Sequence, residues 1–174
     1  MPTSTFECDC PDESATDALG ASLARALLAC ADGGMLVTLR GDLGAGKTTL
    51  VRAVLRALGV RGRIKSPSYA LVEPYAIGEN DIKFKRSLGT YAYHIDLYRF
   101  SSPDEWDDAG LRDMLGAHAL CLVEWPEKAP QLLRRADLDI ALTPSGEGRR
   151  VRIHGGSPSG AAVVRHLASG QTGA

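Results

Sequence analysis

The sequence predicts a single α/β domain of three layers around a mixed, partly parallel central sheet. An apolar run at 35–39 suits a buried strand, and a glycine-rich loop and a helical pattern follow it directly, up to residue 59. Further apolar strands alternate with helical segments along the rest of the chain. Alternation of this kind is typical of α/β layering, in which ligands bind at the carboxyl ends of the strands.

Composition places the chain among ordinary globular domains. It has 174 residues, a mass of 18.5 kDa, 44% hydrophobic and 24% charged residues. A net charge of -1 argues against autonomous nucleic-acid binding. The four cysteines lack zinc-site spacing, and neither a signal peptide nor a membrane-spanning stretch is visible. These features predict a cytoplasmic protein without a membrane partner.

The first part of the chain shows clear element boundaries. Residues 5–8 suit a short strand, and Leu19, Leu23 and Leu27 mark one face of a helix that begins near Asp12. That helix should end near residues 33–34, where two glycines precede the strand at 35–39. After the loop at 41–48, the next helix should end at Gly59.

The second part is predicted as follows. Residues 60–68 form a loop, 69–73 are extended, 74–89 form an exposed hairpin or longer loop, and 90–99 form a strand. Pro103 should begin a short helix, and 120–123 should be a buried strand. Two closing strands lie around 140–142 and 151–153. Residues 155–174, rich in Gly, Ser and Ala, are expected to hold one short helix before a disordered end.

Residues 41–48 read Gly-Asp-Leu-Gly-Ala-Gly-Lys-Thr and match the Walker A pattern G-x-x-x-x-G-K-[ST]. Glycines let successive backbone N–H groups point at a phosphate, and the lysine places a charge on the terminal phosphates. The helix that follows adds the positive end of its dipole. We therefore predict a P-loop NTPase-like fold. The expected nucleotide-binding residues are Asp42, Leu43, Gly44, Ala45, Gly46, Lys47, Thr48 and Thr49.

A carboxylate follows the buried strand at 120–123, as in a Walker B element. Glu124 at such a strand tip would face Mg²⁺ across from the hydroxyl of Thr48, which makes these two residues the candidate metal ligands. Trp125 and Pro126 then stop the strand. The sequence leaves two roles open for Trp125, an aromatic cover on the core or a residue of the site.

The segment from His94 to Arg99 has two-residue periodicity. His94, Asp96 and Tyr98 therefore share one strand face, opposite Ile95 and Leu97. Asp96 could orient attacking water or a water bound to Mg²⁺. Alternatively, the strand is half-solvated and Asp96 pairs with Arg99; spacing does not decide between the two.

The sequence also bears on two other classes of nucleotide-dependent protein, GTPases and small-molecule kinases. A GTPase is disfavoured because no N-K-x-D motif is present and the D-x-x-G match at 107–110 follows no apolar strand. A small-molecule kinase would need an arginine-rich lid, for which Arg134 and Arg135 are the only candidates. No arginine finger can be identified, so we expect weak hydrolysis by the chain alone and stimulation by a partner.

Together these segments resemble the TsaE family, the P-loop ATPases of bacterial tRNA threonylcarbamoyladenosine biosynthesis. The resemblance spans roughly residues 6–154. It is carried by Gly-Asp-Leu-Gly-Ala-Gly-Lys-Thr-Thr at 41–49, Ser-Pro-Ser-Tyr at 66–69, Leu-Val-Glu at 71–73, His-Ile-Asp-Leu-Tyr-Arg at 94–99 and Glu-Trp-Pro-Glu-Lys at 124–128. The chain departs from the family pattern at Ser68, where threonine is usual, and in a longer segment at 76–90.

The resemblance implies specific roles. Lys47 would bind the ATP phosphates, Thr48 and Glu124 would hold Mg²⁺, and Asp96 would be needed for hydrolysis. Trp125 would lie close to the site. A mobile, switch-like segment near the γ-phosphate would comprise Ser66, Pro67, Ser68 and Tyr69.

The expected function follows from the family. Residues 1–154 would form a Mg²⁺-dependent ATPase domain that resets a TsaB–TsaD-like partner complex, which modifies the tRNA adenosine beside the anticodon. Contact with tRNA would be indirect, and the chain alone would be a monomer. The alternatives are the small-molecule kinase and a nucleotide-sensing interaction module without useful turnover.

Overall fold

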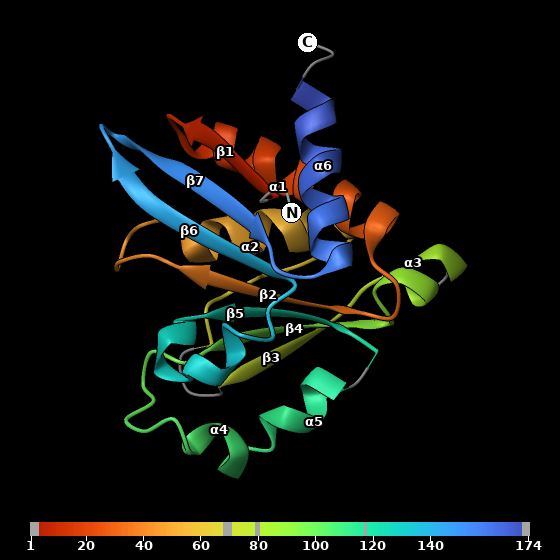
Figure 1. Cartoon of the computed structure of the whole chain (residues 1–174), viewed down its shortest axis with the longest axis vertical. Helices are drawn as coiled ribbons and strands as arrows, with labels where there is room; N and C mark the ends of the chain where they lie inside the picture. The colour runs from red at the N-terminus through yellow and green to blue at the C-terminus, as the bar shows by residue number, and fades with distance from the viewer. Residues whose placement is uncertain (1–3, 68–70, 79–80, 117, 172–174) are drawn as a thin grey trace.

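The computed structural model describes residues 4–67, 71–78, 81–116 and 118–171, and within these ranges seven strands form one sheet (Figure 1). The strands are β1 (Thr5–Cys10), β2 (Met35–Arg40), β3 (Val72–Ala76), β4 (Tyr91–Asp96), β5 (Leu120–Glu124), β6 (Leu138–Ser145) and β7 (Gly148–Gly155). Their order is β1-β7-β6-β2-β5-β4-β3. The central strands β6, β2, β5 and β4 are parallel, whereas β1, β7 and β3 are added antiparallel. The predicted mixed, partly parallel sheet is confirmed.

Helices cover both faces of this sheet (Figure 1). On one face lie α1 (Glu13–Cys30), α2 (Lys47–Ala57) and α6 (Pro158–Gln171), whose buried side chains join one core cluster. On the other face lie α4 (Glu105–Asp108), α5 (Leu111–Gly116) and the 3₁₀ turns η1 (Pro126–Lys128) and η2 (Pro130–Leu132), with a second cluster around Trp106. The chain is thus a three-layer α/β domain. No described helix is long and apolar enough to cross a membrane.

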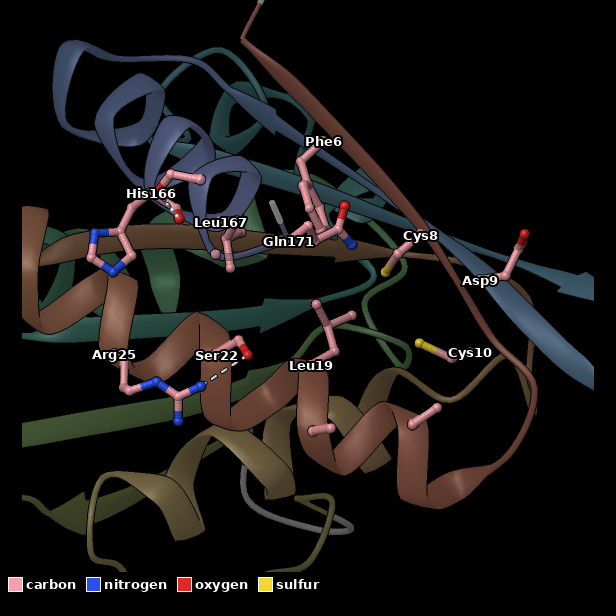
Figure 2. A pocket seen from close by; sticks show the side chains of 14 residues that line it. Phe6, Cys8, Asp9, Cys10, Leu19, Ser22, Arg25, His166, Leu167 and Gln171 are labelled. Carbon is pink, nitrogen blue, oxygen red and sulfur yellow. Dashed lines mark hydrogen bonds between the residues drawn. The ribbon is translucent and has the colours of Figure 1, made fainter. Parts of the chain in front are cut away.

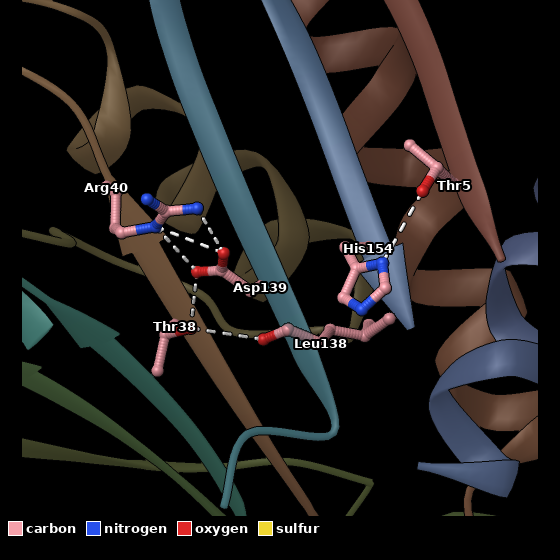
Figure 3. A network of polar contacts seen from close by, with 6 residues as sticks. All are labelled: Thr5, Thr38, Arg40, Leu138, Asp139 and His154. Carbon is pink, nitrogen blue, oxygen red and sulfur yellow. Dashed lines mark hydrogen bonds and ion pairs between the residues drawn. The ribbon is translucent and has the colours of Figure 1, made fainter. Parts of the chain in front are cut away.

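The central strand β2 is buried on both faces, which explains why its sequence is continuously apolar. Val37 and Leu39 face α1, α2 and α6, whereas Leu36 belongs to the opposite cluster. The buried hydroxyl of Thr38 donates to Asp139 Oδ1 at 2.9 Å, and Arg40 Nε lies 3.0 Å from both carboxylate oxygens of Asp139 (Figure 3). These bonds fix the end of β2 against β6 immediately before the glycine-rich loop.

The segment predicted as an exposed hairpin or longer loop is different in the structure. It contains the end of β3 and a short helix, α3 (Ile82–Ser87), which Asp81 caps by accepting from Lys83 N at 2.8 Å. Ile77 and Leu88 on either side are buried and hold the segment to the core. The local polar sequence did not reveal these two anchors.

The C-terminal helix is longer than the predicted short one. α6 runs over 14 residues to Gln171, where a disordered end was expected, and buries Val163, Val164 and Leu167. Gly160 makes the close approach possible, because a Cβ there would lie 1.8 Å from the carbonyl oxygen of Asp137. Small residues make the pattern weak in the sequence, whereas packing on the domain stabilises the helix.

Close packing of α1 on α2 yields a first prediction. A Cβ at Gly20 would lie 2.3 Å from Ala53 Cβ, so the helices touch at backbone distance. Gly20→Ala should lower the free energy of unfolding by about 1–3 kcal/mol through overpacking, measured by urea denaturation. Gly170→Ala is the matched control, because a Cβ there meets open space within α6. It should be neutral or stabilising, and equal stability of both variants would contradict the packing argument.

Candidate nucleotide-binding site

The site lies at the carboxyl ends of three adjacent parallel strands. Glu124 at the end of β5 is in register with Leu39 of β2 and with Asp96 of β4. Strand alternation places Glu124, His94 and Asp96 on the face of the sheet that α2 covers, because Leu122 and Ala92 on the same faces belong to the core around α2. Two acidic residues far apart in sequence therefore meet beside the glycine-rich loop.

The loop at 41–48 leads from β2 into α2 and turns at Gly46. This glycine has φ of 101° and occupies the N-cap position, where no side chain caps the helix in the described part of the chain. The first N–H groups of a helix have no partners within it, and together with the helix dipole they attract an anion. The backbone of this loop thus suits a phosphate group.

A cleft of about 300 Å³ opens at this loop. Its lining combines most of the residues that the sequence placed at the site with two others, Tyr98 and Arg149. The lining residues are Leu43, Gly44, Ala45, Gly46, Lys47, Thr48, Thr49, Ser66, Asp96, Tyr98, Glu124, Trp125 and Arg149. Asp42 is not among them; its side chain is exposed and its carbonyl oxygen accepts from Lys47 Nζ at 3.0 Å. The structure therefore brings three of the predicted groups together: the loop, the two carboxylates and Trp125.

A larger cavity of about 460 Å³ lies elsewhere, between β1, α1 and α6 (Figure 2). Phe6, Leu19 and Leu167 line it, and the thiols of Cys8 and Cys10 lie at one side. Burial, followed by the neighbouring Cys10, raises the pKa of the Cys8 thiol to about 12, so this thiol is not a reactive thiolate at neutral pH. We therefore take the cleft at the loop as the functional site.

Lys47 is held at the mouth of the loop, and its side chain is buried. Its Nζ donates to the carbonyl oxygens of Gly41 and Asp42 and lies 4.0 Å from the centroid of the Trp125 ring. Burial lowers the pKa of Lys47, while the surrounding acids, Glu124 first, act in the opposite direction. The ammonium group is thus positioned by carbonyls and a π face.

Trp125 has an unusual backbone conformation. Its φ of 58° is the only positive value for a non-glycine residue in the described part of the chain. The ring packs against Tyr98, with centroids 5.0 Å apart, and also against the core on the α4 and α5 side. The two roles left open by the sequence therefore coexist, because the indole both covers the core and lines the cleft. Such backbone strain is common at functional sites.

The candidate metal ligands contact each other directly. Thr48 Oγ1 donates to Glu124 Oε1 at 2.8 Å, and the same carboxylate oxygen lies 2.8 Å from His94 Nε2. Both Glu124 and His94 are buried. An ionised carboxylate only accepts, so Nε2 of His94 then carries the proton and fixes the orientation of Glu124. His94 lies inside the core, so the strand is not solvated at this position.

The donor set fits Mg²⁺. One carboxylate and one hydroxyl are hard oxygen ligands, and Mg²⁺ in nucleotide sites takes one or two protein oxygens and completes its shell with phosphates and water. The described residues contain no group of three or more His, Cys, Asp or Glu side chains that could hold a metal ion by themselves. A site of this kind depends on a bound nucleotide to complete it.

Asp96 connects β4 to the segment after α2. Its Oδ2 accepts from Ser66 Oγ at 2.8 Å, and its Oδ1 accepts from Tyr98 N at 2.9 Å. Of the proposed switch segment, Ser66 lines the cleft and Pro67 is half-buried, whereas Ser68 and Tyr69 lie outside the described residues. The carboxylate is therefore fixed at the cleft by one side chain and one backbone amide.

Arg135, one of the two candidates for the lid of the alternative kinase, does not line this cleft. Arg135 lines a cavity with Gly34, Met35 and Ala119, at the end of β2 opposite the glycine-rich loop. By contrast, Arg149 of β7 lines the cleft although the sequence did not single it out. Nothing in the run Arg149-Arg150 distinguishes these arginines without the pairing of β7 with its neighbours.

Comparison with known proteins identifies the family of the chain. A family model described as "Threonylcarbamoyl adenosine biosynthesis protein TsaE" matches residues 10–152. A tRNA threonylcarbamoyladenosine biosynthesis protein TsaE from Haemophilus influenzae is 38% identical over 144 residues, which cover 82% of this chain and 85% of the relative. The protein of the same name from Synechocystis is 37% identical, with coverage of 76% and 77%.

A solved structure supports the same architecture. The crystal structure of Bacillus subtilis YdiB superposes with a TM-score of 0.74 at 24% identity, over 98% of this chain and 99% of that one. At this identity the likeness concerns the fold alone, whereas the family model and the sequence relatives cover most of the chain. The chain therefore belongs to the TsaE family of tRNA threonylcarbamoyladenosine biosynthesis proteins.

Proposed function

We propose that this protein is a Mg²⁺-dependent ATPase that supports tRNA threonylcarbamoylation by binding and resetting a TsaB–TsaD-like complex. The observation that carries the proposal is the meeting of Lys47, Thr48, Glu124 and Asp96 at one cleft beside an uncapped helix N-terminus. A GTPase is disfavoured because the sequence lacks an N-K-x-D motif. Membership of the family supports a role in this pathway, and we infer binding to the partner complex from that role.

Charge stabilisation would come mainly from the loop. Lys47 would exchange its contacts with the carbonyls of Gly41 and Asp42 for the β- and γ-phosphates, while the loop N–H groups bind the phosphate oxygens. Mg²⁺ held by Thr48 and Glu124 would neutralise charge on those oxygens. His94 would keep Glu124 oriented throughout, since its contact to Oε1 is buried.

Asp96 would act on the nucleophile. Water attacks the γ-phosphorus, the bond from phosphorus to the β–γ bridging oxygen breaks, and ADP and phosphate leave. The Asp96 carboxylate would orient the water and accept its hydrogen bond, and Ser66 would hold the carboxylate in place. Because Ser66 belongs to the switch-like segment, movement of that segment would change the position of Asp96 and hence the rate.

Replacing Lys47 tests the binding step. Lys47→Ala should weaken ATP binding at least about tenfold, because a charge-assisted contact to phosphate is lost. Isothermal titration of the full chain with MgATP measures this effect. Lys83→Ala, on exposed α3, is the control and should bind like the wild type. Unchanged affinity of Lys47→Ala would overturn the assignment of the loop.

Replacing Asp96 separates binding from hydrolysis. Asp96→Asn keeps the shape of the side chain and should bind ATP with an affinity within about threefold of the wild type. The rate of phosphate release should fall about 10²–10⁴-fold. The measurement is single-turnover phosphate release in the presence of the partner pair. Asp108→Asn, at an exposed position of α4, serves as the control. If Asp96→Asn hydrolysed ATP at the wild-type rate, the carboxylate of Asp96 would have a structural role only.

The partner is tested directly by mixing the chain with the TsaB–TsaD pair of its own organism. We expect capture of the pair in the presence of ATP, and phosphate release that rises at least about tenfold over the chain alone, because a partner can order the switch-like segment. Capture without any phosphate release would favour the nucleotide-sensing module. Fast release by the isolated chain would contradict partner stimulation.

A further inference from the structure

Arg149 contacts the glycine-rich loop although its strand, β7, is separated in the sheet by β6 from β2, the strand that leads into the loop. It is the second residue of β7, and β7 runs antiparallel to β6, which is itself parallel to β2. The beginning of β7 therefore lies at the same edge of the sheet as the end of β2, where the loop starts. Strand alternation puts Arg149 on the face of Val151 and Ile153, which is the face covered by α1 and α2.

The guanidinium of Arg149 packs directly on the turn of the loop. A Cβ built on Gly46 would lie 2.2 Å from Nη1 and 2.7 Å from Cζ of Arg149. Arg149 also lines the same cleft as Lys47 and Thr48. The cleft thus contains a second cation besides Lys47, contributed by a strand outside the Walker motifs.

Arg149 differs from Arg150 and Arg152, the other two arginines of β7, in its ion pairing. Arg150 Nε lies 2.9 Å from Asp9 Oδ1, and Arg152 Nε lies 2.6 Å from Glu7 Oε1, on the exposed face of β7. By contrast, Nη1 of Arg149 is buried and has no hydrogen-bond partner among the described residues. A buried charged donor without an acceptor is costly, and a ligand oxygen would remove that cost.

We propose that Arg149 is a nucleotide-binding residue that donates from Nη1 to a phosphate oxygen of the bound nucleotide. This inference rests on the proposed function, since it requires ATP in the cleft at Gly46. A guanidinium matches phosphate in a planar fork, so it also fixes the direction of the phosphate chain across the loop. Arg149 then supplies in cis a positive charge that the motifs alone do not provide.

The test uses the full chain with Mg²⁺ and three probes: ATP, ADP and inorganic triphosphate. Arg149→Gln should weaken binding of all three by at least about tenfold, measured by isothermal titration. Arg149→Lys should lie between Arg149→Gln and the wild type, because lysine keeps the charge and loses the fork. Arg150→Gln is the matched control and should bind all three probes within about twofold of the wild type, since that arginine pairs with Asp9 on the other face.

Each outcome decides a separate point. If Arg149→Gln binds triphosphate like the wild type, the phosphate contact is wrong, whereas ATP binding by the wild type still upholds the proposed function. Weakening of ATP and ADP but not of triphosphate would assign Arg149 to the base or ribose and overturn the proposal. A merely structural role would lower the urea midpoint of the nucleotide-free protein and leave triphosphate affinity unchanged. Absence of ATP binding by the wild type would refute both proposals together.

Discussion

Parallel pairing of β2 with β5 is the constraint on which the site depends. The register that sets Leu39 opposite Glu124 brings the end of the loop strand beside the carboxylate, and Thr48 at the start of α2 then reaches Glu124 at 2.8 Å. A register shift by one residue would turn Glu124 to the other face of the sheet. The contacts of the buried Glu124 with Thr48 and His94 hold β5 in this register, while the bonds to Asp139 hold β2 against β6.

The same carboxylate explains why polar residues occupy the core beside the cleft. Glu124 is 2% exposed and His94 is fully buried; His94 contacts Glu124, and Glu124 also accepts from Thr48. A buried charge without a partner would cost several kcal/mol. Because β4 lies next to β5, the pair also places Asp96 two residues beyond His94 at the rim of the cleft. Stability of the core and geometry of the site are therefore linked through one strand pair.

Sequence patterns predicted the elements that carry strong periodicity or a motif. The buried strands around Val37 and Leu122, the helix that begins near Asp12 and the loop at 41–48 all lie where local chemistry places them. The patterns failed where distant packing decides the outcome. α3 forms between two anchors, Ile77 and Leu88, and α6 is held by burial of small and apolar residues against α1 and β7. Neither anchoring surface is visible in the short stretch of sequence around the helix that it holds.

The sequence by itself determined that the chain carries a phosphate-binding loop, two candidate acids and a chain of segments similar to one family. Spacing and side-chain chemistry are local properties, so they survive in the primary structure. Only the tertiary structure decided that His94 is buried against Glu124, that Trp125 covers Lys47, and that Arg149 rather than Arg150 faces the loop. These facts depend on strand order and register, which join residues between 30 and about a hundred positions apart and have no signature in either segment alone.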